Sequence, residues 1–148
     1  MHCVSIYPTQ LKDAHLNRIN FLRNFSENVG LSEHSNTKDT GLKISLASLV
    51  FKPKYIERHF TILDKSKTKD GHVSLNPLEL KILVDFTKKN INEIKEYINQ
   101  ETEFEEMLGV ENRELSHQEK LNRDYYRGRF ASKNKNDVEI YNWEDKQI

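Results

Sequence analysis

The sequence is short of several residue types and features, and each shortage narrows what the protein can be. Its only cysteine is Cys3, which excludes a disulfide within the chain. With 5 glycines, it has no glycine-rich loop of the kind that holds phosphate groups. No apolar run approaches the roughly 18 residues of a membrane span, and the chain opens without a charged-then-apolar leader. We therefore expect a cytoplasmic protein that makes no contact with a membrane.

The residues that are present favour a small folded domain. The chain has 148 residues, of which 36% are hydrophobic and 31% are charged, at the polar end of the globular range. Its 7 phenylalanines and 6 tyrosines supply bulky side chains for a core. We predict a mainly helical α+β fold with a small β component, in one compact domain over residues 1–148. Residues 31–41 are expected to form an exposed loop, and residues 131–148 a C-terminal strand or tail.

Charge is balanced overall but unevenly distributed. Lysine plus arginine and aspartate plus glutamate both number 23. Residues 93–119 nevertheless hold 9 acids against 2 bases, and residues 120–135 hold 6 bases against 1 acid. Patches of opposite sign steer partners, or pair with each other within one fold. The sequence leaves both interpretations open.

Helix start signals stand at two places in the second half of the chain. Asn76-Pro77-Leu78-Glu79 is a capping box with proline at the first helical position, and it predicts a long helix from Pro77 to about Gln100. Ser116-His117-Gln118-Glu119 is a second box and predicts another helix. Residues 102–109 would either extend the first helix or form a second, short one, in both cases stopping at Gly109.

The ends of the chain carry weaker strand signals. Apolar spacing predicts a helix from Leu11 to Val29, with Gly30 just past its end. Cys3–Tyr7 and Asp137–Trp143 both alternate between apolar and polar residues. These two segments are therefore predicted as strands that could pair.

The stretch from Asp64 to Glu79 looks at first like a cation loop, but its spacing excludes calcium. If Asp70 and Gly71 take the fifth and sixth positions, proline stands at the twelfth, where a bidentate glutamate is needed. Asp-Gly between β-prone flanks is typical of a hairpin turn. We predict a hairpin with Lys65, Lys67 and Lys69 at its tip. The scattered histidines form no zinc pattern, so neither a metal nor another cofactor is expected.

The segment just before this hairpin admits two interpretations. One is a helix from Ser45 to Phe51, a tight corner at Lys52-Pro53 and a second helix from Pro53 to about Asp64. The other makes Leu42–Leu46 and His59–Leu63 strands, because β-branched and aromatic residues alternate there.

In the first interpretation, the order helix, corner, helix and hairpin resembles a winged helix-turn-helix. That resemblance implies binding to duplex DNA, with the second helix in the major groove and the hairpin on the backbone. The corner departs from the pattern, since Phe51-Lys52-Pro53 stands where a glycine or small polar residue is usual. The candidate contacts to nucleic acid or another partner are Lys52, Lys54, Tyr55, Arg58, Lys65, Lys67 and Lys69.

A second basic segment runs from Leu121 to Lys135 and interleaves cations with aromatic rings. Guanidinium groups grip phosphate and rings stack on unpaired bases, which suits RNA or single strands. The same mixture serves protein–protein contacts, and some of the rings could instead belong to the core. The candidate contacts here are Arg123, Tyr126, Arg127, Arg129 and Lys133.

The sequence shows no catalytic set of residues. His59 and His72 each begin a His-x-Thr/Ser pattern, which we attribute to chance because the two copies lie so close together. We therefore predict a non-enzymatic regulatory protein that binds nucleic acid, DNA rather than RNA. The alternative is a small inhibitor or adaptor of the phage or mobile-element type that binds a host protein.

Overall fold

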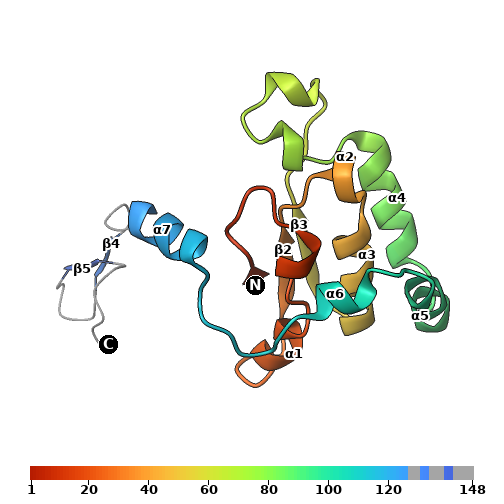
Figure 1. Cartoon of the computed structure of the whole chain (residues 1–148), viewed down its shortest axis with the longest axis horizontal. Coiled ribbons are helices and arrows are strands. Elements are labelled where there is room, and N and C mark those ends of the chain that lie inside the picture. Colours follow the sequence, from red (N-terminus) through yellow and green to blue (C-terminus); the bar gives the residue numbers. More distant parts are fainter. Residues whose placement is uncertain (127–130, 134–138, 142–148) are drawn as a thin grey trace. The chain divides into compact units, whose positions relative to one another are not determined.

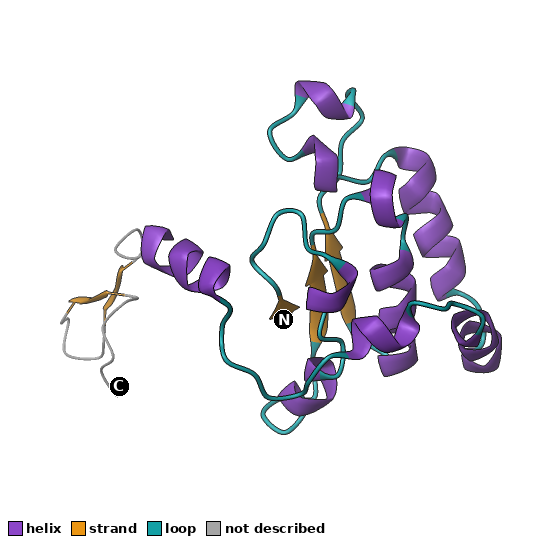
Figure 2. Ribbon diagram, viewed as in Figure 1, coloured by secondary structure: helices purple, strands orange, loops and turns teal. Residues whose placement is uncertain are grey.

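The computed structural model describes residues 1–126, 131–133 and 139–141. The chain divides into two compact units, Met1–Arg113 and Glu114–Ile148. The first unit holds a parallel sheet with helices packed against it (Figure 1, Figure 2). Among the described residues, the second unit holds one helix and a pair of short strands.

The sheet of the first unit has three strands: β1 (His2–Cys3), β2 (Gly30–Glu33) and β3 (Tyr55–Arg58). They pair in the order β1-β2-β3, and both pairs are parallel. Parallel neighbours cannot be joined by a tight turn, so each connection crosses over through helical segments. These are η1 (Leu11–Asp13) and α1 (Arg18–Leu22) in the first crossover, and α2 (Thr37–Thr40), α3 (Lys43–Ser48) and η2 (Leu49–Phe51) in the second.

The two faces of this sheet differ in character. Side chains alternate along a strand, so Leu31 and Ile56 point to one face and Ser32 and Glu57 to the other. The first face packs on α3 and belongs to the hydrophobic core. On the second face, the register places Cys3, Ser32 and Glu57 side by side in one row. The core is built from buried side chains that include Leu16, Ile19, Leu31, Ile44, Leu75, Leu83, Ile98 and Met107.

Three α-helices of the first unit follow β3: α4 (Pro77–Thr87), α5 (Ile91–Asn99) and α6 (Phe104–Leu108). Asn76 forms the predicted capping box with Glu79, and Asn90 forms a further one with Glu93. The second box begins a new helix, α5, so the predicted long helix from Pro77 to about Gln100 is divided into α4 and α5. Gly109 then reverses the chain at φ +52°, a backbone conformation that disfavours side chains.

The winged helix-turn-helix prediction is wrong. The helix from Ser45 to Phe51 exists, as α3 and η2. The predicted reading helix does not, because Tyr55–Arg58 is a strand that pairs in parallel with β2. The alternative strand at Leu42–Leu46 is also wrong, since that stretch lies largely in α3.

The hairpin at Asp70-Gly71 is wrong as well. Residues 61–74 form a loop with two 3-10 turns, η3 (Lys65–Lys67) and η4 (Gly71–Val73). Phe60 and Leu75 close its base by a parallel bridge, whereas hairpin arms run antiparallel. Gly71 is needed for a different reason, because a Cβ there would collide with the carbonyl of Lys65.

Two predictions in the first third also need correction. The helix from Leu11 to Val29 is reduced to η1 and α1, and Gly30 opens β2 instead of ending a helix. The exposed loop at residues 31–41 contains most of β2 and all of α2, and much of it is buried. The strand at Cys3–Tyr7 shrinks to the two residues of β1.

In the second unit, the Ser116 capping box is confirmed. The Ser116 and Glu119 backbone and side chains bond reciprocally at the start of α7 (His117–Tyr126). β4 (Ala131–Lys133) pairs antiparallel with β5 (Glu139–Tyr141), which falls within the predicted late strand. In the described residues, β5 therefore pairs with β4 and not with the first strand.

None of the helices in the described part of the chain is both long enough and apolar enough to cross a membrane.

Candidate active site

The carboxyl ends of parallel strands meet at one edge of a sheet, and polar side chains that follow the strands gather there. His34 directly follows β2 and His59 directly follows β3, while Tyr7 lies in the chain leaving β1. The Tyr7 and His34 rings stack with centroids 4.1 Å apart. The His59 ring stands edge-on to both, at 5.2 Å from His34 and 5.7 Å from Tyr7. We call these three residues the ring cluster.

Hydrogen bonds fix the protonation of His34. Its Nδ1 lies 3.3 Å from the Val4 carbonyl, which can only accept, so Nδ1 carries the proton. In the neutral ring, Nε2 is then an acceptor, and the Tyr7 hydroxyl donates to it at 2.9 Å. Burial lowers the pKa of His34, although its bond to Val4 acts in the opposite direction. The ring is thus neutral near pH 7, with its basic nitrogen on Tyr7.

Two acidic side chains, Asp70 and Glu57, act on the ring cluster. Asp70 Oδ2 lies 3.8 Å from His59 Nδ1. Ser32 donates to the carboxylate of Glu57 in the row of side chains on the same face of the sheet. The loop after β3 stays beside the cluster because Leu75 N–H donates to the His59 carbonyl at 2.7 Å.

A buried ion pair lies on the opposite face, in the positions just before the two histidines. Glu33 and Arg58 pair directly, with side chains only 1% and 3% exposed. Ser45 of α3 donates to Glu33 at 2.7 Å and accepts from Arg58 at 2.8 Å. Burial lowers the pKa of Arg58 to about 10, so it remains a cation at neutral pH. The ion pair therefore links the carboxyl ends of β2 and β3 to each other and to α3.

This arrangement is suited to moving or holding a proton. Tyr7 and His34 form a donor–acceptor pair, and His59 has a carboxylate beside it, as general acid–base chemistry requires. Neutral imidazoles are also common metal ligands. The described stretches of the chain contain no group of three histidine, cysteine or acidic side chains placed to hold a metal ion.

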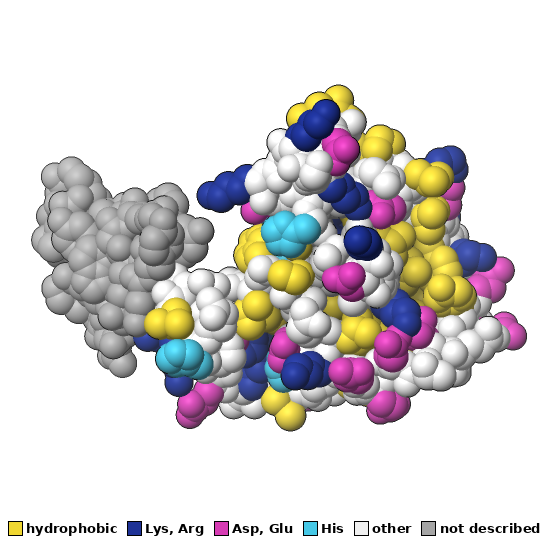
Figure 3. Space-filling view, turned by 45° about the horizontal axis from the view of Figure 1, so that its top comes forward, with side chains coloured by type: hydrophobic (Ala, Val, Ile, Leu, Met, Phe, Trp, Pro, Cys, Tyr) yellow, Lys and Arg dark blue, Asp and Glu magenta, His cyan; other side chains and the backbone are white. Residues whose placement is uncertain are grey.

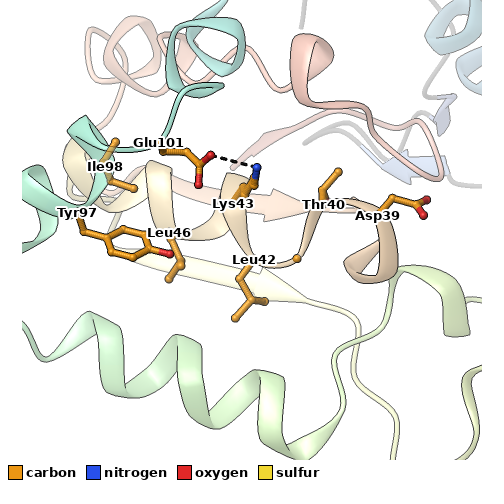
Figure 4. Close-up of a pocket in the computed structure, with 9 residues that line it drawn as sticks. Asp39, Thr40, Leu42, Lys43, Leu46, Tyr97, Ile98 and Glu101 are labelled. Atoms are coloured by element: carbon orange, nitrogen blue, oxygen red, sulfur yellow. Dashed lines mark ion pairs between the residues drawn. The ribbon is translucent and has the colours of Figure 1, made fainter.

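A separate pocket of about 290 Å³ lies where the turn between α2 and α3 faces α5 (Figure 4). Leu46, Tyr97 and Ile98 give it an apolar wall. Lys43 lines it too, but its ammonium pairs with Glu101 at 3.0 Å and also with Glu103. The ammonium of Lys43 is therefore neutralised by acids of this chain, and the pocket is a weaker candidate than the ring cluster.

The structure separates the binding residues predicted in the first unit. Lys52, Lys54 and Tyr55 are exposed at the amino end of β3, away from the ring cluster. Arg58 is buried in its ion pair and cannot reach a nucleic acid. Lys65 pairs with Glu79 at 2.8 Å. The exposed lysines of the loop after β3 are Lys67 and Lys69.

The predicted residues of the second basic segment fall in the other unit. Arg123 is exposed on α7. Arg127 and Arg129 lie outside the described residues. So do the side chains of Tyr126 and Lys133, whose backbones end α7 and β4. Their role as partner contacts stays a prediction.

Sequence reasoning missed Tyr7 and His34 and dismissed His59. A signal was present, because Leu-Ser-Glu-His and Ile-Glu-Arg-His both place a histidine directly after a charged residue and three positions after an apolar one. Two such segments with helical residues between them are what neighbouring parallel strands produce when both end in a site.

Comparison with known proteins places this geometry in a family. The model of the NeuB family matches residues 1–102. The chain belongs to the NeuB family. The N-acetylneuraminate-9-phosphate synthase of Drosophila melanogaster is 41% identical over 83 residues, which is 56% of this chain and 22% of that protein. The pseudaminic acid synthase of Campylobacter jejuni is 31% identical over 147 residues, or 98% of this chain and 37% of that protein.

A solved structure agrees. The spore coat polysaccharide biosynthesis protein SpsE of Bacillus subtilis superimposes with a TM-score of 0.68 at 33% identity, over 86% of this chain and 36% of that one. The NeuB chain thus spans well under half the length of these relatives. Its fold is a parallel-sheet segment related to barrel-type enzymes, and not a winged helix.

These findings correct the predicted function. A non-enzymatic DNA-binding regulator is wrong, and so is a phage-type inhibitor of a host protein, because the NeuB relatives are synthases. Nucleic acid and a host protein are likewise the wrong partners. The names of the relatives are instead those of synthases that make small acidic sugars.

Proposed function

We propose that this chain forms part of the active site of a synthase that makes a sialic-acid-like acidic sugar. The observation that carries the proposal is the convergence of Tyr7, His34 and His59 at the carboxyl edge of a parallel sheet. Barrel enzymes build their active sites at that edge, from the ends of several strands. The names of the relatives supply the product class, since they include N-acetylneuraminate-9-phosphate and pseudaminic acid synthases.

In this proposal the ring cluster handles protons. The Tyr7 hydroxyl and His34 Nε2, 2.9 Å apart, exchange a proton with the reacting sugar. His59 lies beside this pair, with its Nδ1 3.8 Å from Asp70 Oδ2. The ion pair of Glu33 and Arg58 keeps both histidines in register, because those residues directly precede them on neighbouring strands.

Other strands must complete such a site. Among the described residues, β1 and β3 each pair with one strand only, which leaves two open sheet edges in the first unit. A barrel has no open edges. We therefore infer that polypeptide outside these 148 residues supplies the remaining strands and part of the substrate contacts. We also propose a cytoplasmic location, to which a single unpaired cysteine is suited.

A chimaera tests the proposal directly. In the Campylobacter jejuni pseudaminic acid synthase, this chain replaces the stretch that aligns with 98% of it. The chimaera is expressed in a Campylobacter jejuni mutant without its own enzyme, and pseudaminic acid is measured by mass spectrometry. We expect the product to return. His34→Ala or His59→Ala in the chimaera is expected to lower its formation by about 100-fold, the usual scale of acid–base catalysis.

The matched control is His117→Ala, which removes an exposed imidazole at the start of α7. It should leave product formation unchanged. Two results would contradict the proposal: a chimaera present at the normal cellular level that makes no product, or His34→Ala and His59→Ala chimaeras as active as the unsubstituted one.

A further inference from the structure

The loop between β3 and α4, residues 61–74, carries three lysines and follows the ring cluster's His59 in the chain. We call it the lysine loop. It begins two residues after His59, and its Asp70 lies 3.8 Å from the His59 ring. In Figure 1 it stands beyond the carboxyl end of the sheet, and in Figure 3 dark-blue lysine or arginine side chains stand out over that end of the molecule.

The lysine loop is held in one shape by its own bonds. Asp64 caps η3 by accepting from Ser66 N–H at 2.9 Å, and Ser74 donates to the Asp70 carbonyl at 2.8 Å. Lys65 anchors it to the rest of the unit, because its ammonium bonds to Glu79 of α4 and to Thr37 of α2. A loop fixed in this way needs little further ordering of its backbone on binding.

The three lysines therefore differ in what they can do. Lys65 is neutralised by Glu79 at 2.8 Å. Lys67 and Lys69 are exposed, and no acidic side chain of the described residues lies within ion-pair distance of them. The nearest acids along the chain are engaged: Asp64 holds Ser66, and Asp70 faces His59. Two cations on a fixed loop at the rim of a site are placed to bind an anion.

We propose that Lys67 and Lys69 bind the phosphate group of a phosphorylated amino-sugar substrate and make this chain prefer it over the unphosphorylated sugar. This inference rests on the proposed function. The names of the relatives pose the choice, because one product carries a 9-phosphate and pseudaminic acid does not. A phosphate on the far end of the sugar lies away from the reacting carbons, so its contacts belong on the rim of the ring cluster. Lysine suits this role as a point charge for phosphate.

The test uses the full chain and two probes, N-acetylglucosamine 6-phosphate and N-acetylglucosamine. Binding is followed by the movement of backbone amide NMR signals on titration. The unsubstituted chain is expected to bind the phosphorylated probe about tenfold more tightly, with the largest movements at residues 65–70. The double variant Lys67→Gln/Lys69→Gln is expected to lose this preference. The matched control is Lys81→Gln/Lys88→Gln, which removes two exposed cations from the region of α4.

Three outcomes would overturn the inference: no preference in the unsubstituted chain, signal movements confined to other residues, or an equal loss of preference in both double variants. The last would indicate a general field effect and not a phosphate contact. Failure of the proposed function shows separately, in the chimaera. An active chimaera together with no preference removes only the phosphate contact, whereas an inactive chimaera with a lysine-dependent preference retains that contact and removes the synthase assignment.

Discussion

Removing Arg58 tests how much the buried ion pair of Glu33 and Arg58 contributes to the stability of this NeuB chain. In Arg58→Met, the Glu33 carboxylate stays 1% exposed and keeps only Ser35 N–H, at 2.5 Å, and the Ser45 hydroxyl, at 2.7 Å, as partners. Breaking a buried pair from one side costs about 3–5 kcal/mol. The arginine bonds to the Ser35 and Val73 carbonyls are long, 3.4 and 3.3 Å, and add little.

One feature of Arg58 reduces the expected loss in the free energy of unfolding. Its Nε is buried and has no hydrogen-bond partner in the described residues, so the native arginine already bears a penalty that methionine removes. We therefore expect Arg58→Met to lower the free energy of unfolding by about 3 kcal/mol, the lower end of that range. Urea unfolding followed by far-UV circular dichroism measures it.

The double variant Glu33→Leu/Arg58→Met makes the prediction sharper. Replacing both partners by apolar groups removes the stranded charge, so the double variant is expected to be more stable than Arg58→Met alone. Lys81→Met is the control, because its pair with Asp85 is exposed and its loss should leave the free energy of unfolding nearly unchanged. A loss below about 1 kcal/mol in Arg58→Met, or a double variant that shows the sum of both single losses, would refute the reasoning.

Three further predictions concern other parts of the first unit. Burial lowers the pKa of both His2 and His34, so the unfolded chain binds more protons and stability should fall as the pH drops below about 6.5. His2→Asn should flatten this dependence in urea midpoints measured across that range. An unchanged slope would contradict it. Gly109→Ala should cost about 1–3 kcal/mol in thermal unfolding, because φ is +52° and the new Cβ would stand 2.9 Å from His15 Cα. Asn90→Ala should cost about 1 kcal/mol through loss of the second capping box while the exposed Asn92→Ala stays near zero, and equal losses in the two would count against the cap.

The parts of the fold that sequence reasoning predicted correctly are those in which neighbouring residues decide the structure. The capping box at Asn76 needs only residues within one turn, and it forms as expected. The same holds for Ser116 and Glu119. Local hydrogen bonds leave a local signature, so these helix starts could be predicted without knowing the partners of the helix.

The sheet could not be predicted in this way, because its strands are short and their pairing is distant in sequence. β2 and β3 have four residues each, and their partners come from crossovers that hold several helical turns. Parallel pairing gives no turn signal between the strands. Asp70-Gly71 offered a false one, since in this loop Gly71 is required by its close approach to the Lys65 carbonyl.

Residues that support the site made its strands hard to predict from the sequence. A half-buried strand normally alternates apolar with polar residues, but Glu33 and Arg58 occupy core-facing positions of β2 and β3 and break that pattern. They are tolerated there because each satisfies the other, and Ser45 of α3 bonds to both. Their pairing fixes the positions of His34 and His59, each of which directly follows its strand. A local rule broken twice, at the same register of two neighbouring strands, is what a functional site built at strand ends requires. The anomaly that hid the parallel sheet therefore marks where its chemistry lies.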